Sequence, residues 1–364
     1  MTVQPNPQPR CILMIKSHSM GVGDVLRSSA AWRALHERFP GVRLHLLFLS
    51  KHAGYPTEGL IREHHLLSGA HFVTIRAGDP SQAKAQRISA RDLKAQVQAI
   101  AREVAPDWVI DFEASGLRST LVARWAAQAC GARTLGIAEF AGRGWLYDQA
   151  APSVQRYRAQ RNLPQRMDYT NRDFVALAAW GIERDGRPIE LQRTADGQQA
   201  IERLTGAWPA GLRVVGLNIG CGTPDAVPKR PPIDVVVEAM HQVMQDQPSV
   251  LLLTGAPFEK AVNADFVAQY RQRHGQDHIL IDLAGATSLS GLTGLIQACD
   301  VFVSSDSGPY HMAVAMRKPT VGWFMLEEPT AYHRDAWCRC LLRPRADAVS
   351  QAVRDLCPAP APRA

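Results

Sequence analysis

The chain has 364 residues, of which 46% are hydrophobic and 21% are charged, and its formal net charge is +7. This composition excludes a disordered or fibrous protein. No run approaches the roughly 18 consecutive apolar residues of a membrane span, and the first ten residues contain no apolar signal-peptide core, so we expect a cytoplasmic protein. At this length we expect two domains with a cleft between them.

The positive charge fits an anionic partner, although a solvated basic surface would look the same. Because the arginines are spread along the chain without a nucleic-acid-binding motif, we expect no nucleic-acid partner. The seven cysteines are odd in number and form no paired CxxC motifs, which indicates reduced thiols. A metal or redox site at Cys338, Cys340 and Cys357 is the alternative, but this spacing matches no common zinc motif.

The first predicted elements are a strand, a glycine loop and a helix. Residues 11–15 predict a buried strand, Gly21 and Gly23 mark the loop, and residues 24–38 predict the helix. A second strand at 42–49 completes a β-α-β unit with parallel strands. The alternation continues, in chain order, with a helix at 90–104, a strand at 108–112 and a helix at 119–129.

Residues 147–193 are basic and polar around one helix, 169–180, and we interpret them as the interdomain connection. A second α/β series follows, and it predicts a second parallel sheet. Its expected strands are 212–218, 249–254, 278–282, 300–304 and 320–324, and its expected helices are 234–244, 259–273, 289–298 and 310–316. We therefore predict an α/β fold of two doubly wound domains, 1–185 and 186–364, with ligands beyond the carboxyl ends of the strands.

The segment from Ser305 to His311 is the predicted diphosphate site. It joins a strand to a helix, so backbone N–H groups at the positive end of the helix dipole can face an anion. Gly308 permits close approach, Ser307 can donate its hydroxyl, and a protonated His311 can donate to a phosphate. A helix N-cap at Asp306 or Ser307 is the alternative that needs no ligand.

Four motifs occur in a distinctive order and spacing. They are SMGVGDVL at 19–26, DLAGATSL at 282–289, SDSGPYHMA at 305–313 and KPT at 318–320. Together they closely resemble glycosyltransferase family 9, the ADP-heptose lipopolysaccharide heptosyltransferases. The resemblance implies a GT-B fold, with two Rossmann-like domains facing across a cleft. It also implies inverting, metal-independent transfer of a heptose from an ADP-sugar to a lipopolysaccharide-core saccharide.

Asp24 is the candidate catalytic residue. It lies where the first glycine loop enters a helix, and Gly21 and Gly23 leave room for the donor beside the backbone. From the residues alone, its carboxylate is either a helix N-cap or a general base that takes the proton of the acceptor hydroxyl. The resemblance implies the base.

The resemblance also implies further donor contacts. A lysine in the loop 220–232 should contact the phosphates, but the family's Trp-Pro dipeptide is replaced here, so Lys229 and Arg230 are both candidates. Glu259 should accept ribose hydroxyls, and Thr287 and Ser288 should present backbone groups to the nucleobase. A solvated cation and a helix-stabilising first-turn carboxylate are the alternatives. We expect no metal, because no DxD triplet occupies a suitable loop, and no cofactor besides the ADP-sugar.

The implied acceptor is a saccharide or glycolipid, and the basic surface would suit peripheral association with the inner face of the cytoplasmic membrane. A protein acceptor or another sugar stays open. Other functional classes are an NAD-dependent oxidoreductase, a non-catalytic nucleotide-sugar-binding protein and a sugar-nucleotide epimerase. The first glycine loop lacks the third glycine or alanine of GxGxxG, which argues against the oxidoreductase. We interpret residues 16–19 as an inert surface loop and most tryptophans as core or interface anchors.

Overall fold

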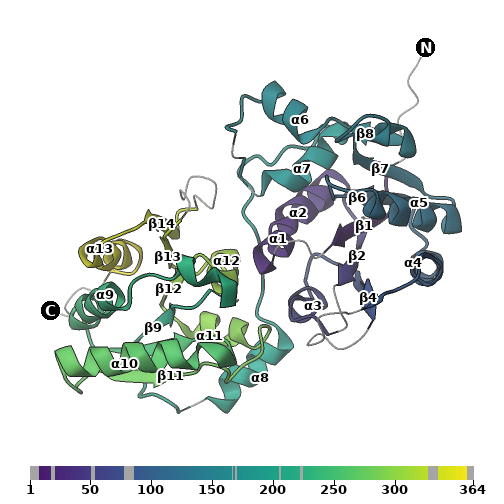
Figure 1. The fold of residues 1–364 in the computed structure, drawn as a ribbon. Coiled ribbons are helices and arrows are strands. Elements are labelled where there is room, and N and C mark those ends of the chain that lie inside the picture. Colours follow the sequence, from purple (N-terminus) through teal and green to yellow (C-terminus); the bar gives the residue numbers. More distant parts are fainter. Residues whose placement is uncertain are drawn as a thin grey trace. The chain divides into compact units, whose positions relative to one another are not determined.

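The computed structural model describes residues 8–17, 21–50, 54–77, 86–165, 167–168, 170–204, 206–221, 224–326 and 335–358, with the backbone alone for 76–77, 86–87 and 224–225. The chain divides into two compact units, Met1–Ile189 and Glu190–Ala364 (Figure 1). The boundary predicted from the sequence, between residues 185 and 186, lies a few residues earlier. Among the described helices, none is both long and apolar enough to cross a bilayer.

The first unit alternates strands with helices, η denoting 3₁₀ turns. In chain order its elements are β1 (Cys11–Ser17), α1 (Val22–Leu26), α2 (Ser28–Arg38), β2 (Arg43–Ser50), α3 (Thr57–Ile61), β3 (Gly69–Thr74), β4 (Arg76–Ala77), β5 (Gln86–Arg87), α4 (Ala90–Val104), β6 (Trp108–Asp111), α5 (Arg118–Cys130), β7 (Arg133–Ile137), η1 (Arg143–Leu146), β8 (Gln149–Ala151), α6 (Val154–Gln160), α7 (Asn171–Leu177) and η2 (Ala178–Trp180).

Most of these strands form a six-stranded parallel sheet in the order β3-β2-β1-β6-β7-β8. The order reverses at β1, where Met14 pairs with Leu46 of β2 on one side and with Ile110 of β6 on the other. Such a reversal opens a crevice at the carboxyl ends of the two central strands, where doubly wound folds bind ligands.

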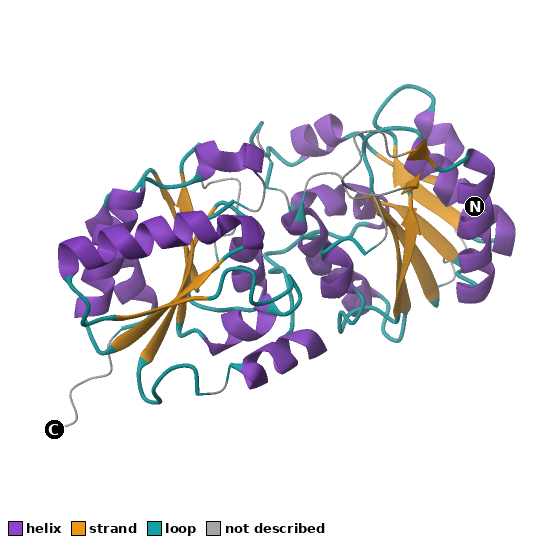
Figure 2. Cartoon of the chain, turned by 60° about the horizontal axis from the view of Figure 1, so that its bottom comes forward, coloured by secondary structure: helices purple, strands orange, loops and turns teal. Residues whose placement is uncertain are grey.

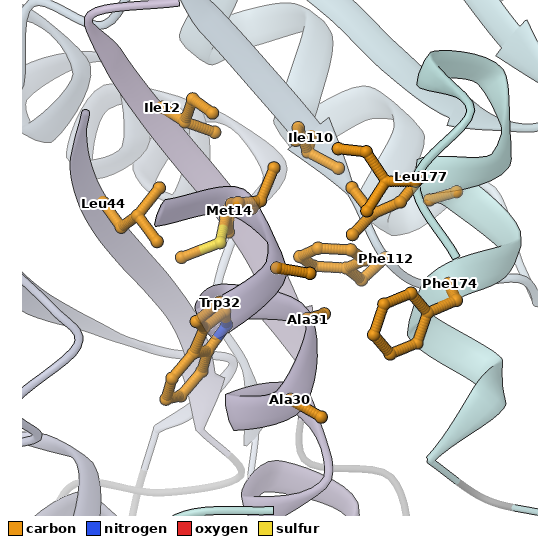
Figure 3. Packing of buried hydrophobic residues seen from close by; sticks show 14 of the residues in the cluster. Ile12, Met14, Ala30, Ala31, Trp32, Leu44, Ile110, Phe112, Phe174 and Leu177 are labelled. Carbon is orange, nitrogen blue, oxygen red and sulfur yellow. The ribbon is translucent and has the colours of Figure 1, made fainter. Parts of the chain in front are cut away.

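Both faces of the first sheet are buried, which explains the continuous apolar run of β1. Ile12 and Met14 join one hydrophobic cluster with Trp32 of α2 and Phe174 of α7 (Figure 3). The alternate residues of β1 pack against α4 and α5 on the opposite face. Because α7 contributes to this core, the stretch that we interpreted as an interdomain connection forms part of the first unit up to Ile189.

Two predictions for the first unit are wrong in detail. The helix predicted over 24–38 is interrupted at Arg27, which separates α1 from α2. The first strand continues to Ser17, so Lys16 and Ser17 are strand residues rather than a surface loop, because β2 supplies parallel partners for both. The sequence pattern also missed the short elements α3, β3, β7, β8 and α6.

The second unit repeats this plan. In chain order its elements are α8 (Ala195–Arg203), β9 (Arg213–Asn218), η3 (Pro224–Lys229), α9 (Ile233–Gln245), β10 (Ser249–Thr254), η4 (Pro257–Glu259), α10 (Lys260–His274), β11 (Ile279–Asp282), α11 (Leu292–Ala298), β12 (Val301–Ser305), α12 (Gly308–Ala315), β13 (Thr320–Phe324), β14 (Cys338–Leu342) and α13 (Ala346–Leu356).

The described strands of this unit form a parallel sheet in the order β11-β10-β9-β12-β13-β14, which is the order of the first sheet. Helices cover both faces of each sheet (Figure 2). One face of the second sheet packs against α9, α10 and α13 through residues such as Leu217, Val303 and Met240. Here the strand order reverses between β9 and β12, so the loops that follow these two strands are neighbours. The sequence pattern did not predict α8, β14 or α13.

Candidate active site

The loops after β9 and β12 are joined by hydrogen bonds at the reversal point of the second sheet. The Asn218 side-chain amide donates to Oγ of Ser307 at 3.2 Å and to the carbonyl of Gly220 at 3.0 Å. The Ser305 hydroxyl donates to the same Gly220 carbonyl. Asn218 escaped the sequence analysis because it reads there as the last residue of a strand.

Lys229 reaches this site from the end of η3. Its ammonium lies 2.8 Å from Oδ2 of Asp306, with side-chain exposures of 35% for Lys229 and 7% for Asp306. Ser307 occupies the N-cap position of α12, but its side chain forms no cap hydrogen bond. The alternative of a side-chain N-cap is therefore wrong for Ser307, and Asp306 precedes the N-cap position.

Arg230 lies beside Lys229 and is half-buried. Its Nε is buried and has no hydrogen-bond partner among the described residues. A buried donor without a partner is costly, and an anionic ligand would relieve that cost. Lys229 is thus bonded to Asp306, whereas Arg230 keeps a donor without a partner among the described residues. Both residues remain candidates for the phosphate contact.

Glu259 follows β10 and is 2% exposed. One of its carboxylate oxygens accepts a hydrogen bond from the backbone N–H of Ala256 at 2.8 Å. The other carboxylate oxygen lies so close to Gly220 that a β-carbon there would come within 1.8 Å of it. Only glycine therefore fits at position 220, and Glu259 touches the same loop that Asn218 and Ser305 organise.

Thr287 and Ser288 lie between β11 and α11. The Ser288 hydroxyl contacts the Asp196 carboxylate of α8 and accepts a hydrogen bond from the Gly291 N–H at 2.9 Å. Hydrogen bonds from the hydroxyls of Ser288 and Ser290 lower the pKa of Asp196. The Ser288 hydroxyl is bonded to Asp196 of α8, so the backbone N–H and carbonyl of Ser288 are the groups that a nucleobase could contact. His311 is half-buried on α12, with its ring edge-on to Tyr310.

In the first unit, Asp24 lies in α1, just beyond the carboxyl end of β1, and is 8% exposed. Its Oδ1 is bonded to the guanidinium of Arg27, one turn later. Its Oδ2 is buried and has no hydrogen-bond partner among the described residues. Gly21 precedes the helix with a φ of 148°, a conformation that L side chains rarely adopt. Gly23, the predicted close-approach position, belongs to the first turn of α1.

A buried ionic network extends from Arg27. The Lys16 ammonium lies 2.6 Å from Oδ1 of Asp173, whose other oxygen accepts from the Ser28 hydroxyl. Arg27 Nε is 3.8 Å from the same carboxylate. Burial alone would raise the pKa of Asp173, but the charges of Lys16 and Arg27 and these hydrogen bonds outweigh it and lower that pKa.

The loop after β6 is fastened by Arg143, which is 1% exposed. Arg143 donates to the carbonyl of Glu113 at 2.6 Å and to the carboxylate of Asp111 at 3.2 Å. Burial raises the pKa of Asp111 to about 6. The Glu113 carboxylate accepts from the Ser17 N–H at 2.8 Å, which ties this loop to the end of β1.

The cysteines are all free thiols. Cys338 and Cys340 lie with their sulfurs 3.8 Å apart, and both contact the Tyr310 hydroxyl. Cys357 is elsewhere, near Arg213 and Asp300. Across the part of the chain that the structure describes, no group of three histidine, cysteine or acidic side chains is gathered as a metal site.

The structure thus brings together Asn218, Lys229, Glu259, Asp306 and Ser307 in the second unit. Asp24 stands with Arg27 and Asp173 in the first. Ser19 and Met20 of the first motif, together with His18, Gly222 and Thr223, lie outside the described residues. The spacing of Asp24 and Arg27 is a signal that sequence reasoning missed, since residues three apart on a helix are neighbours.

Comparison with known proteins points to one family. The family model described as glycosyltransferase family 9 (heptosyltransferase) matches residues 143–349. Among solved structures, ADP-heptose lps heptosyltransferase II of E. coli has a TM-score of 0.68 at 16% identity, over 95% of this chain and 98% of that one. E. coli heptosyltransferase WaaC with ADP-2-deoxy-2-fluoro heptose has a TM-score of 0.65 at 16% identity, over 95% and 99%.

A family 9 glycosyl transferase from Veillonella parvula has a TM-score of 0.67 at 13% identity, over 95% of this chain and 97% of that one. At such identities the likeness shows a shared fold, and it confirms the predicted GT-B-type α/β fold with two doubly wound parallel sheets. None of the curated protein sequences compared with the chain matches it.

Proposed function

Since the chain belongs to glycosyltransferase family 9, the heptosyltransferases, we propose that it transfers a heptose from ADP-heptose to a lipopolysaccharide-core saccharide with inversion. The enzyme is a glycosyltransferase, and the proposal concerns its substrates, stereochemistry and site residues. The state of Asp24 carries it: a nearly buried carboxylate with one oxygen bonded to Arg27 and the other without a partner among the described residues. The fold that the chain shares with WaaC, whose structures hold ADP and an ADP-heptose analogue, supports the donor.

In this mechanism Asp24 is the general base. The acceptor hydroxyl gives its proton to Oδ2 of Asp24 while its oxygen attacks the anomeric carbon from the side opposite the diphosphate. A new glycosidic bond forms, the bond from the anomeric carbon to the diphosphate oxygen breaks, and ADP leaves with the electron pair. Arg27 orients the carboxylate by bonding its other oxygen, and so acts as a positioning residue.

Charge on the departing diphosphate is met by groups of the second unit without a metal ion. A lysine ammonium has three donors, so Lys229 can keep Asp306 while donating to a phosphate oxygen. Arg230, the Ser307 hydroxyl and the N–H groups that open α12 at Gly308 complete this electrostatic stabilisation, with His311 when protonated. Glu259 accepts ribose hydroxyls, and the backbone at Thr287 and Ser288 receives the nucleobase.

We also propose a cytoplasmic enzyme that works at the inner face of the cytoplasmic membrane, because its acceptor class is a glycolipid. Family membership sets aside the NAD-dependent oxidoreductase and the epimerase. Family membership also favours an enzyme over a non-catalytic nucleotide-sugar-binding protein, and turnover tests that alternative.

The first experiment is thermal stability with ADP, UDP, GDP and NAD for the wild type and Asp306→Ala. A shift specific to ADP that Asp306→Ala removes would support the donor site. Acceptor-dependent release of ADP from ADP-heptose, abolished in Asp24→Asn, would then establish transfer. A shift with NAD alone would contradict the donor assignment, and ADP binding without turnover would indicate the non-catalytic protein.

A further inference from the structure

Four large apolar side chains are exposed on two neighbouring segments of the first unit. Trp145 of η1 is 90% exposed, Leu117 at the start of α5 is 50% exposed, and Leu121 and Phe140 are each 44% exposed. We call Leu117, Leu121, Phe140 and Trp145 the apolar patch. Trp145 is an exception to the expectation that most tryptophans anchor a core, because its ring lies almost wholly in solvent.

Hydrogen bonds hold the two segments against each other. Arg124 of α5 donates to the carbonyl of Leu146 at 3.0 Å, next to Trp145. Arg143 donates to the Thr120 hydroxyl at 3.0 Å and also bonds the carbonyl of Ala114, on the opposite side of Leu117 in the chain. Leu117, Leu121 and Arg124 follow helical spacing and so share one side of α5. Hydrogen bonds therefore hold in place the two segments that carry the exposed apolar side chains.

Electrostatics favours an anionic partner for this surface. From 114 to 161 the sequence contains seven arginines, no lysine and two acidic residues, Glu139 and Asp148. Both carboxylates already accept local hydrogen bonds, Glu139 from the Val154 N–H and Asp148 from the Thr134 N–H. Arg143 is buried against Asp111 and Arg161 pairs with Glu183, so Arg118 and Arg124 are the cations next to the apolar patch in the chain. Arg118, beside Leu117, is exposed. Tryptophan, phenylalanine and leucine with flanking arginines form the composition that binds the interface of an anionic lipid bilayer.

The patch lies at the carboxyl edge of the first sheet, because its residues follow β6 and β7, and the reversal point lies at the same edge. Arg143 precedes Trp145 by two residues and bonds the Glu113 carbonyl, and the Glu113 carboxylate bonds the Ser17 N–H at the end of β1. Asp24 follows that end of β1 in α1. A bilayer bound by the patch would therefore lie on the side of this unit where the proposed base acts.

We propose that the apolar patch inserts into the interfacial layer of an anionic lipid bilayer, with Arg118 and Arg124 at the level of the headgroups. This inference rests on the proposed function for its purpose, since a bilayer-embedded glycolipid acceptor gives the docking a role. The binding of the patch to lipid does not itself require that the protein transfers sugar. A second copy of the chain covering the same patch is the competing occupant.

The test is co-sedimentation with vesicles of phosphatidylcholine alone and of phosphatidylcholine with phosphatidylglycerol. The wild type should bind the anionic vesicles, more weakly at high salt, and Trp145→Ala should bind about tenfold more weakly. Leu326→Ala, which removes a side chain that is 53% exposed in the second unit, is the matched control and should bind as the wild type. Brominated lipids should quench tryptophan emission in the wild type, and Trp145→Phe should lose that quenching.

Asp24→Asn separates this inference from the proposed function, because it should bind vesicles like the wild type whether or not it transfers sugar. Equal vesicle binding by Trp145→Ala and the wild type would overturn the inference. Equal binding of the wild type to neutral and anionic vesicles would also overturn it. An oligomer in solution that Trp145→Ala breaks into monomers would assign the patch to a subunit interface instead.

Discussion

The Lys229 ammonium lies 2.8 Å from Oδ2 of Asp306, so the loop after β12 holds a cation that belongs to the loop after β9. Since Lys229 is the more exposed partner, it can turn its remaining donors to a ligand while Asp306 fixes its position. The pair connects residues 77 positions apart. It is the feature of the second unit that can be tested most directly.

Lys229→Ala should weaken ADP binding by about 10- to 100-fold, because a hydrogen bond to a charged group contributes roughly 1.5–3 kcal/mol. Arg230→Ala, measured beside it, decides which of the two cations contacts phosphate. Isothermal titration with ADP provides the measurement. Lys318→Ala removes the same charge from a half-buried lysine that donates to the Gln297 carbonyl, and it should leave affinity unchanged. Unaltered affinity in both loop variants would contradict the phosphate assignment.

Asp24→Asn should lower kcat by about 10²- to 10⁴-fold, the usual contribution of a general base, without changing the affinity for ADP. The amide keeps the size of the side chain but cannot take the acceptor proton. Single-turnover transfer measures the chemical step, and a cooperative melting transition with retained ADP binding confirms the fold. Wild-type kcat in this variant would exclude Asp24 as the base.

Arg27→Gln should reduce kcat less than Asp24→Asn does, because it removes the group that orients the carboxylate but leaves the base. The readout that separates positioning from mere structure is the ratio of kcat to KM effects. We expect KM for ADP-heptose to stay constant while kcat falls. A change confined to thermal stability would assign Arg27 a structural role only.

Asp173→Asn should destabilise the first unit by about 3–5 kcal/mol, since it leaves the buried Lys16 ammonium without its counter-charge. The wild-type contribution also depends on pH. The folded-state pKa of Asp173 is lowered, so its stabilisation is present above the unfolded value of about 3.9 and is lost as pH falls through the folded pKa. Urea unfolding of both proteins from neutral to acid pH measures it, and an equal acid dependence would contradict it.

His241 should make the second unit less stable in mild acid. Its ring stacks on His274 with centroids 3.6 Å apart, His278 is nearby, and burial followed by these rings lowers the pKa of His241, while Glu238 raises it. The stabilisation of the neutral form is present above the unfolded pKa of about 6.5 and is lost as pH falls below it. His241→Gln should flatten the pH dependence of the melting temperature between about pH 7 and 5. An unchanged slope would count against this assignment.

Local patterns allowed much of the fold to be predicted. Apolar runs such as residues 11–15 and 249–254, separated by helical periods and glycine turns, predict parallel strands because both faces of such strands must be buried. This apolar pattern did not identify the short edge strands. β14 begins Cys-Arg-Cys and, among the described strands, pairs with β13 alone, so it needs no continuous apolar run.

The sequence by itself determined the alternation of strands and helices and the two loops that carry Asp24 and Asp306, because periodicity and glycine placement act over a few residues. Only the tertiary structure decided that Asp173 neutralises Lys16 across 157 positions and that Asp306 takes Lys229. It also decided that Trp145 stays in solvent. The order of the strands in each sheet decides which loops become neighbours. That order therefore decides which charges pair and which aromatic rings are buried, and no local sequence pattern contains it.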